Sequence, residues 1–195
     1  MHLIPNIFKN EACVPKVMRY NLCLTLLLLL SSTLAGCTSD ETSEEKLESF
    51  PQFSTTGDNG EVYDNQRMAG EAFIVMFSAE WCNNPCYTTM FAIWETIPEL
   101  PILVMSTDPA ENASGLTLQD WHESANAHDD DGEDPKVTLT TYVFMKGSDV
   151  AEELGIKSPG SLAFVTPNGE ISEIHIGRLD DSSDIQAKWD AANSS

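Results

Sequence analysis

Basic residues are scarce in this chain of 195 residues: 10 Lys and Arg stand against 31 Asp and Glu, which gives a formal net charge of −21. A surface with this charge repels the phosphates of DNA and RNA, and no cluster of basic residues offsets the repulsion. We therefore expect no nucleic-acid partner. The same excess of acid means that attraction to anionic lipid headgroups cannot attach the chain to a membrane.

Long apolar runs are few as well. The strongest one covers residues 22–30, well short of the roughly 20 residues that a membrane-spanning helix needs. Lys9, Lys16 and Arg19 precede this run, and small residues follow it up to Gly36. A basic flank, a short apolar run and a small-residue end are typical of a secretory signal peptide, which we predict for residues 1–36.

The signal ends in Leu34-Ala-Gly-Cys37, which resembles a bacterial-type lipobox. That resemblance implies cleavage before Cys37 and attachment of lipid to its thiol, and two or three acyl chains would anchor the protein stably. Residues 37–50 are polar and acidic, with almost nothing to bury, so we predict a disordered linker. The expected location is outside the cytoplasm, on a membrane, as a periplasmic or cell-surface lipoprotein.

The remaining residues, 51–195, alternate between two kinds of apolar pattern. Met90, Ile93, Trp94 and Ile97 recur at the spacing of one helix face, whereas residues 71–77 form a short apolar run typical of a buried strand. We expect strands at 71–77, 101–106, 137–144, 162–165 and 171–176, and helices at 87–97 and 116–127. A short helix capped by Ser148 should end at Gly155, and Ser182 or Ser183 should cap a last helix. This order predicts an α/β domain with a central mixed β-sheet flanked by helices.

Cysteine is limited to two residues in this domain, Cys82 and Cys86, which lie between the first strong strand and the first strong helix. The other three cysteines precede the domain: Cys13, Cys23 and Cys37. Asn84 is a good N-cap and Pro85 suits the first helical position, so both thiols should lie around a helix N-terminus, where the dipole favours a thiolate. Cys82, outside the helix, is then the expected exposed nucleophile, and Cys86 the resolving thiol.

The segment Phe77-Ser-Ala-Glu-Trp-Cys-Asn-Asn-Pro-Cys86 resembles the active site of the thioredoxin superfamily. Phe53 with Asp58-Asn-Gly60, and Gly155-Ile156 with Pro159 and Phe164-x-x-Pro-Asn-Gly169, are similar to parts of its TlpA-like and redoxin-like members. The resemblance implies a thioredoxin-like fold with an N-terminal extension. It also implies thiol–disulfide exchange without a cofactor, acting on cysteine-containing protein substrates outside the cytoplasm.

The same resemblance assigns supporting roles to three residues near the cysteine pair. Trp81 would shape the docking surface, Pro85 would start the helix, and Pro159 would be the cis-proline close to Cys82. Two departures stand out: the cysteines have three residues between them instead of two, and Met76 occupies the place of a buried proton-handling carboxylate. In a regular helix, Cα atoms four residues apart lie about 6.2 Å from each other, near the upper limit for a disulfide, so we expect a loop at residues 83–84 to relieve the strain.

Two other functions fit the same pair. An inert structural disulfide is one, although a bond across so small a loop removes little entropy from the unfolded chain. The other is a Cu(I) carrier, because Cys-x-x-x-Cys resembles the motif of Sco-type copper chaperones and thiolates suit that ion. Those chaperones add a histidine just before the strand that begins here near Leu162, and this sequence has none there. We therefore expect no metal site.

Overall fold

The computed structural model describes residues 47–109, 116–129 and 139–195. The predicted signal peptide, the predicted lipidation site Cys37 and most of the predicted linker lie outside these residues. In the part of the chain that is described, no helix is long and apolar enough to cross a membrane. The chain contacts the sheet a few residues before residue 51, the predicted start of the domain. The Ile171 amide donates to the Glu48 carbonyl at 2.7 Å, and Phe50 is buried.

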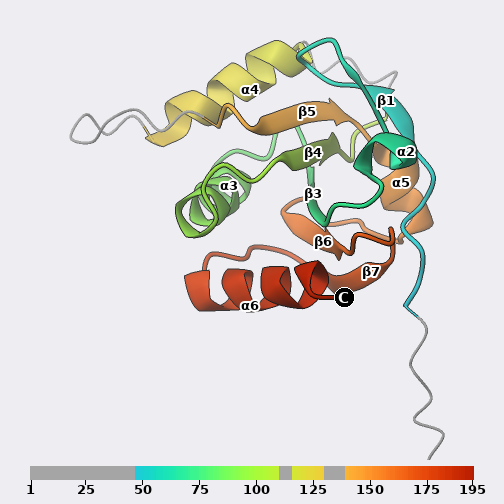
Figure 1. Ribbon diagram of the computed structural model, residues 1–195. Helices are drawn as coiled ribbons and strands as arrows, with labels where there is room; N and C mark the ends of the chain where they lie inside the picture. The colour runs from blue at the N-terminus through green and yellow to red at the C-terminus, as the bar shows by residue number, and fades with distance from the viewer. Residues whose placement is uncertain (1–46, 110–115, 130–138) are drawn as a thin grey trace, which may run out of the picture. The chain divides into compact units, whose positions relative to one another are not determined.

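A five-stranded mixed sheet forms the centre of the domain, in the order β5-β4-β3-β6-β7 (Figure 1). Its strands are β3 (Phe73–Ser78), β4 (Ile102–Ser106), β5 (Tyr142–Lys146), β6 (Ser161–Val165) and β7 (Ile171–His175). β3 pairs in parallel with β4, and β4 with β5, whereas β6 runs antiparallel to both β3 and β7. The fold class predicted from the sequence, a mixed sheet flanked by helices, is confirmed.

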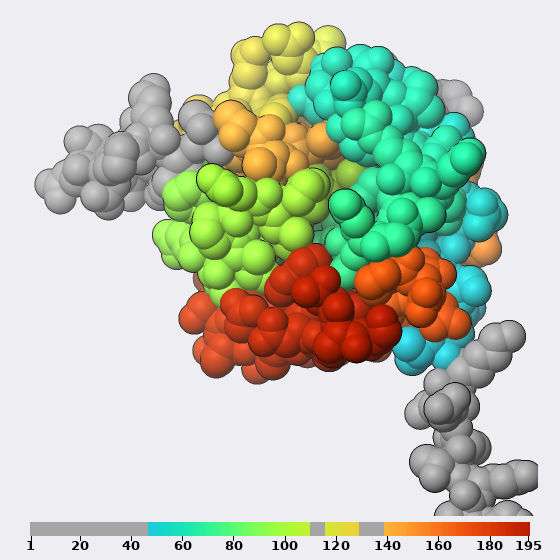
Figure 2. Space-filling view, in the orientation of Figure 1, coloured from blue at the N-terminus to red at the C-terminus, as the bar shows by residue number. Residues whose placement is uncertain are grey.

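Helices cover both faces of the sheet. The helices are α2 (Asn65–Met68), α3 (Asn84–Thr96), α4 (Leu118–Asn126), α5 (Ser148–Glu153) and α6 (Ser182–Asn193), with a 3₁₀ turn η2 (Ala127–Asp129) after α4. On one face, α3, α4 and α6 pack against the sheet; Figure 2 shows the surfaces of α3 and α6 lying side by side. On the other face lie α5, α2 and an N-terminal hairpin of β1 (Ser54–Thr56) and β2 (Val62–Asp64).

The alternation of side chains along β3 explains why this strand lies at the centre. Ile74 and Met76 belong to the core under α3, α4 and α6, while Val75 and Phe77 belong to the core under α5 and the hairpin. Every residue of β3 is buried, as expected for a strand covered on both faces. Met76 is therefore an ordinary core residue, surrounded by apolar side chains.

Some predicted boundaries and caps were wrong. The strand expected at 137–144 begins only at Tyr142, because residues 139–141 form a turn in which the Tyr142 amide donates to the Leu139 carbonyl at 2.9 Å. The last helix is capped by Asp181, not by Ser182 or Ser183: its carboxylate accepts from the Asp184 amide at 3.0 Å. Gly147, not Ser148, takes the N-cap position of α5. Both helices thus have their N-cap at the residue before the predicted serine.

The N-terminal hairpin is held against β5 by one aspartate. Asp58 Oδ1 accepts from the Phe144 amide at 2.8 Å, and Asp58 Oδ2 pairs with His122 Nδ1 of α4 at 2.6 Å. His122 Nε2 lies 3.0 Å from the Leu139 carbonyl oxygen, and its ring stacks on Phe144. The hairpin is thereby fixed to two elements of the domain. Residues 52–55, which run into β1, line one surface hollow together with α5.

Candidate functional site

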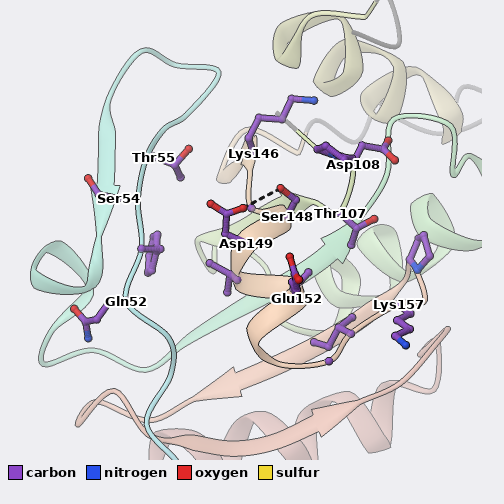
Figure 3. A pocket seen from close by; sticks show the side chains of 18 of the residues that line it. Gln52, Ser54, Thr55, Thr107, Asp108, Lys146, Ser148, Asp149, Glu152 and Lys157 are labelled. Atoms are coloured by element: carbon purple, nitrogen blue, oxygen red, sulfur yellow. Dashed lines mark hydrogen bonds between the residues drawn. The ribbon is translucent and has the colours of Figure 1, made fainter. Parts of the chain in front are cut away.

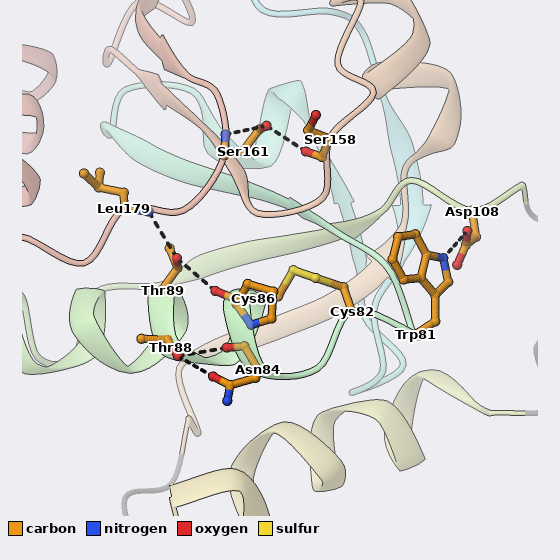
Figure 4. Close-up of a disulfide and its surroundings, with 12 residues drawn as sticks. Trp81, Cys82, Asn84, Cys86, Thr88, Thr89, Asp108, Ser158, Ser161 and Leu179 are labelled. Carbon is orange, nitrogen blue, oxygen red and sulfur yellow. Dashed lines mark hydrogen bonds between the residues drawn. A yellow bond between two sulfur atoms is a disulfide. The ribbon is translucent and has the colours of Figure 1, made fainter.

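Cys82 and Cys86 form a disulfide bond at the start of α3 (Figure 4). Their Cα atoms lie 5.8 Å apart, inside the range of ordinary disulfides and closer than in a regular helix. Cys82 lies before the helix and Cys86 within it, as predicted. Cys82, expected to be exposed, retains only 6% of its surface, and Cys86 is completely buried.

The turn between β3 and α3 places the first cysteine. The Cys82 amide donates to the Ala79 carbonyl at 2.9 Å, and the Tyr87 amide donates to the Asn83 carbonyl, also at 2.9 Å. Asn83, not Asn84, is therefore the N-cap residue, and its side chain makes no capping bond. Because α3 begins at Asn84, Pro85 is its second residue. The positive end of the helix dipole still lies at Cys82, which favours a thiolate there when the pair is reduced.

The loop before β6 reaches the disulfide through Gly160. A Cβ added at this glycine would lie 3.9 Å from Cys86 Sγ, and the Gly160 amide donates to the Phe77 carbonyl at 2.7 Å. Its φ of +92° favours glycine. Pro159, the preceding residue, lines the same surface hollow as Trp81. The cis Ser158–Pro159 peptide bond, inferred from the resemblance, stays a prediction.

Trp81, immediately before the first cysteine, is the most exposed aromatic residue in the described chain, at 65%. Its indole Nε1–H donates to Asp108 Oδ1 at 3.2 Å (Figure 4). Asp108 follows the end of β4, so the contact joins the cysteine turn to the neighbouring strand. A large, mostly apolar side chain is thus held in solvent next to the disulfide, and the docking role expected for Trp81 stays a prediction.

A buried polar cluster behind Trp81 was not predicted from the sequence. The Glu80 side chain is 1% exposed; it forms an ion pair with Lys146 of β5 and accepts from Ser106 Oγ of β4 at 3.0 Å. Ser106 Oγ also accepts from the Asp108 amide at 3.2 Å. The ends of three adjacent strands thus converge on one carboxylate, two residues before Cys82. Glu80 within the cysteine motif was visible as a charge next to an apolar strand, but nothing in the sequence indicated its partner.

The two carboxyl groups of this cluster have opposite ionisation tendencies. Burial works against the ionised form of Glu80, but its contacts with Lys146, Ser106 and Asp108 outweigh burial, so that its pKa is lowered. The pKa of Asp108 is raised, first by burial and then by the adjacent Glu80, against the effect of the Trp81 hydrogen bond. Glu80 is therefore the member that carries the negative charge, and Asp108 is the one that more readily holds a proton.

The described residues do not assemble a set of metal ligands around the cysteine pair. Within residues 47–109, 116–129 and 139–195, no three His, Cys, Asp or Glu side chains lie close enough together to hold a metal ion. His128 comes near α3, but its ring packs on Tyr87 and Phe91. His175, in β7, is within hydrogen-bonding distance of the Arg178 carbonyl oxygen, at 3.1 Å. The donor set that a Cu(I) carrier of the Sco type would need is not formed by these residues.

Comparison with known proteins gives a fold. The sequence matches no protein-family model and no curated protein sequence. Among solved structures, dsbF from MTB superposes with a TM-score of 0.54 at 18% identity, covering 76% of this chain and all of its own. The fold is thioredoxin-like. BsSco, a member of the Sco family of cytochrome c oxidase assembly proteins, has a TM-score of 0.56 at 16% identity, over 75% of this chain and 94% of its own.

A lipoprotein with this thioredoxin-like fold is also among the similar structures. The pneumococcal exposed lipoprotein thioredoxin Etrx1 from Streptococcus pneumoniae has a TM-score of 0.55 at 17% identity, covering 72% of this chain and 98% of its own. At these identities the likeness establishes the architecture alone. The chemical feature that this chain itself presents is the disulfide at the N-terminus of α3.

Proposed function

We propose that this protein is a thiol–disulfide oxidoreductase that acts through reversible opening and closing of the Cys82–Cys86 disulfide. The observation that supports this most directly is the position of the bond, at the N-terminus of α3 and beside an exposed Trp81. A disulfide that served only for stability would gain little from closing so short a loop. It would also have no need of a helix N-terminus, which stabilises the thiolate of the open form.

The exchange reaction follows from the placement of the two sulfurs. In the reduced protein, the Cys82 thiolate attacks a disulfide of the partner protein, forms a mixed disulfide and displaces one partner sulfur as a thiolate. Cys86 then attacks Cys82 Sγ, which releases the second partner sulfur and closes the Cys82–Cys86 bond. The proton of the Cys86 thiol passes to the released sulfur. The protein dithiol is thereby oxidised and the partner disulfide reduced, and the reverse sequence oxidises a partner dithiol.

A redox titration tests this function. Purified protein equilibrated in glutathione or dithiothreitol redox buffers should convert reversibly between dithiol and disulfide, as measured by the mass added on thiol alkylation. We expect a midpoint between about −270 and −120 mV, the range of thioredoxin-fold exchange proteins. A bond that stays closed well below about −300 mV would instead be a structural disulfide, and the proposal would be wrong.

We further propose that the protein acts outside the cytoplasm, anchored by lipid at Cys37 after removal of residues 1–36. The support is the Leu34-Ala-Gly-Cys37 motif, together with the Cys82–Cys86 disulfide, because disulfide bonds persist in the oxidising surroundings outside the cytoplasm. Intact-mass analysis of the protein extracted from membranes should show an N-terminus at Cys37 and added acyl mass. Recovery of the unmodified full-length chain from the cytoplasm would contradict both the anchor and the location.

A further inference from the structure

A surface hollow of about 910 Å³ extends from Trp81 along α5 to the N-terminal segment that enters the hairpin (Figure 3). We call it the α5 hollow. Trp81, next to Cys82, and Pro159, next to Gly160, both line it. In Figure 3, Gln52, Ser54 and Thr55 lie on the side opposite to Thr107 and Asp108, and Asp108 accepts from the Trp81 indole. The hollow is thus continuous with the surface around the disulfide.

The lining of the α5 hollow has more carboxyl groups than ammonium groups. Asp149 and Glu152 extend from α5 into the space between residues 52–55 and Thr107, as Figure 3 shows, and Asp108 lines the hollow near Trp81. Lys146 also lines it, but this ammonium is ion-paired with the buried Glu80. The remaining lining cation is Lys157. With a net charge of −21 on the whole chain, the hollow is a region that attracts positive charge.

Apolar groups lie between these charges. Phe53 comes from the N-terminal segment, residues 52–55, where it is half-buried and packs edge-on against Phe50 at 5.9 Å between ring centroids. Trp81 adds the largest exposed apolar surface, whereas Val150 and Ile156 form the nearly buried floor. An open surface that offers apolar and acidic patches along its length suits an extended polypeptide better than a compact small molecule, which a closed cavity would bury almost completely.

We propose that the α5 hollow binds the stretch of the partner protein next to its reacting cysteine, and that Asp149 and Glu152 select a positively charged stretch. This inference rests on the proposed function, because a partner whose sulfur reaches Cys82 must also lie against Trp81, where the hollow begins. Complementary charge raises the rate of encounter and disfavours partners of the same sign. The N-terminal segment, residues 52–55, extends the contact away from the disulfide.

Two synthetic peptides test the selection. Each carries one cysteine in a mixed disulfide with thionitrobenzoate, and they differ only in a neighbouring stretch that holds two lysines in one and two glutamates in the other. The Cys82 thiolate of the reduced protein attacks this disulfide and thionitrobenzoate leaves as a coloured anion. Cys86 then displaces the peptide sulfur, which takes up the Cys86 proton, while the Cys82–Cys86 bond closes. The measured quantity is the second-order rate of thionitrobenzoate release.

We expect the lysine peptide to react about tenfold faster than the glutamate peptide, with the difference shrinking as salt is added. The double variant Asp149→Asn/Glu152→Gln should lose most of this preference. The matched control Glu95→Gln/Glu153→Gln removes the same charge from exposed positions on α3 and α5 that do not line the hollow, and it should keep the preference. Far-ultraviolet circular dichroism checks that both variants are folded, and the symmetrical thionitrobenzoate disulfide, which has no peptide, serves as the peptide-free reference.

Two results would overturn the inference: equal rates with the two peptides in the unmodified protein, or a loss of preference in the control as large as in the hollow variant. The second result would mean that the overall charge of the protein, and not the α5 hollow, makes the selection. Failure of the proposed function would look different, because the reduced protein would then release thionitrobenzoate from none of the three disulfides faster than free dithiothreitol does.

Discussion

Replacing Cys82 by serine is expected to abolish disulfide exchange, whereas replacing Cys86 by serine should stop the reaction halfway. Cys82 is the cysteine that precedes α3 and keeps some exposure, while Cys86 is completely buried inside the helix. Only Cys82 can therefore be reached by a partner sulfur. Without Cys86 the mixed disulfide on Cys82 has no resolving thiol and should accumulate. Turnover of a model protein disulfide and non-reducing electrophoresis measure the two effects.

Cys37→Ser is a suitable control, because it makes the same atomic change at a cysteine outside the domain. In detergent solution this variant should exchange disulfides at the normal rate while losing its predicted lipid. Mixed disulfides trapped on Cys86 in the Cys82→Ser variant would show that the roles of the two sulfurs are reversed. Full activity in either of the domain variants would mean that the cysteine pair does not carry the reaction.

Replacing Lys146 by methionine is expected to lower the free energy of unfolding by about 3 kcal/mol at neutral pH. The Glu80 side chain is 1% exposed, so removing its ammonium partner leaves an ionised carboxylate in the interior, with Ser106 as a remaining hydrogen-bond donor. The Lys146 side chain is 29% exposed, so its ammonium keeps part of its hydration in the folded protein. Removing it therefore recovers little desolvation free energy. Chemical denaturation of the oxidised protein measures the difference.

Lys157→Met is the matched control, since it makes the same substitution at an exposed lysine that lines the same hollow. We expect its unfolding free energy to stay within about 0.5 kcal/mol of the unmodified protein. Adding Glu80→Gln to Lys146→Met should recover much of the loss, because no buried charge is then left unpaired. If Lys146→Met and Lys157→Met were equally stable, the Glu80–Lys146 pair would contribute nothing to the fold.

The Lys146→Met variant should also differ from the unmodified protein in how its stability depends on pH. In the unmodified protein the pKa of Glu80 is lowered in the folded state, so its stabilising contribution is present above the ordinary carboxyl value of about 4.3 and is lost as the pH falls through the folded pKa. Without Lys146, burial dominates and the folded pKa should rise, so that acid stabilises the variant relative to neutral pH. The stability gap should therefore narrow on acidification; a gap that is constant with pH would contradict this account of Glu80.

Several features of this protein followed from local sequence alone. The apolar run before Trp81 and the periodic residues after Pro85 indicated a buried strand followed by a helix, and this placed Cys82 and Cys86 at their junction. Burial of a strand on both faces and of one stripe of a helix leaves a pattern along the chain that does not depend on distant partners. Helix ends were less certain, because Asn83 and Asn84, or Asp181 and Ser182, are competing caps within one residue of each other.

The polar surroundings of the disulfide were decided by the tertiary structure. Glu80 meets Ser106 across 26 residues of chain and Lys146 across 66, and only the parallel pairing of β3 with β4 and of β4 with β5 brings the ends of these strands together. Met76 is an apolar residue in an apolar run and lies in the core, but no periodicity could show that a carboxylate two residues before Cys82 would be buried as well. A single polar side chain in a loop carries no repeating signal, and its role depends on which strands end beside it.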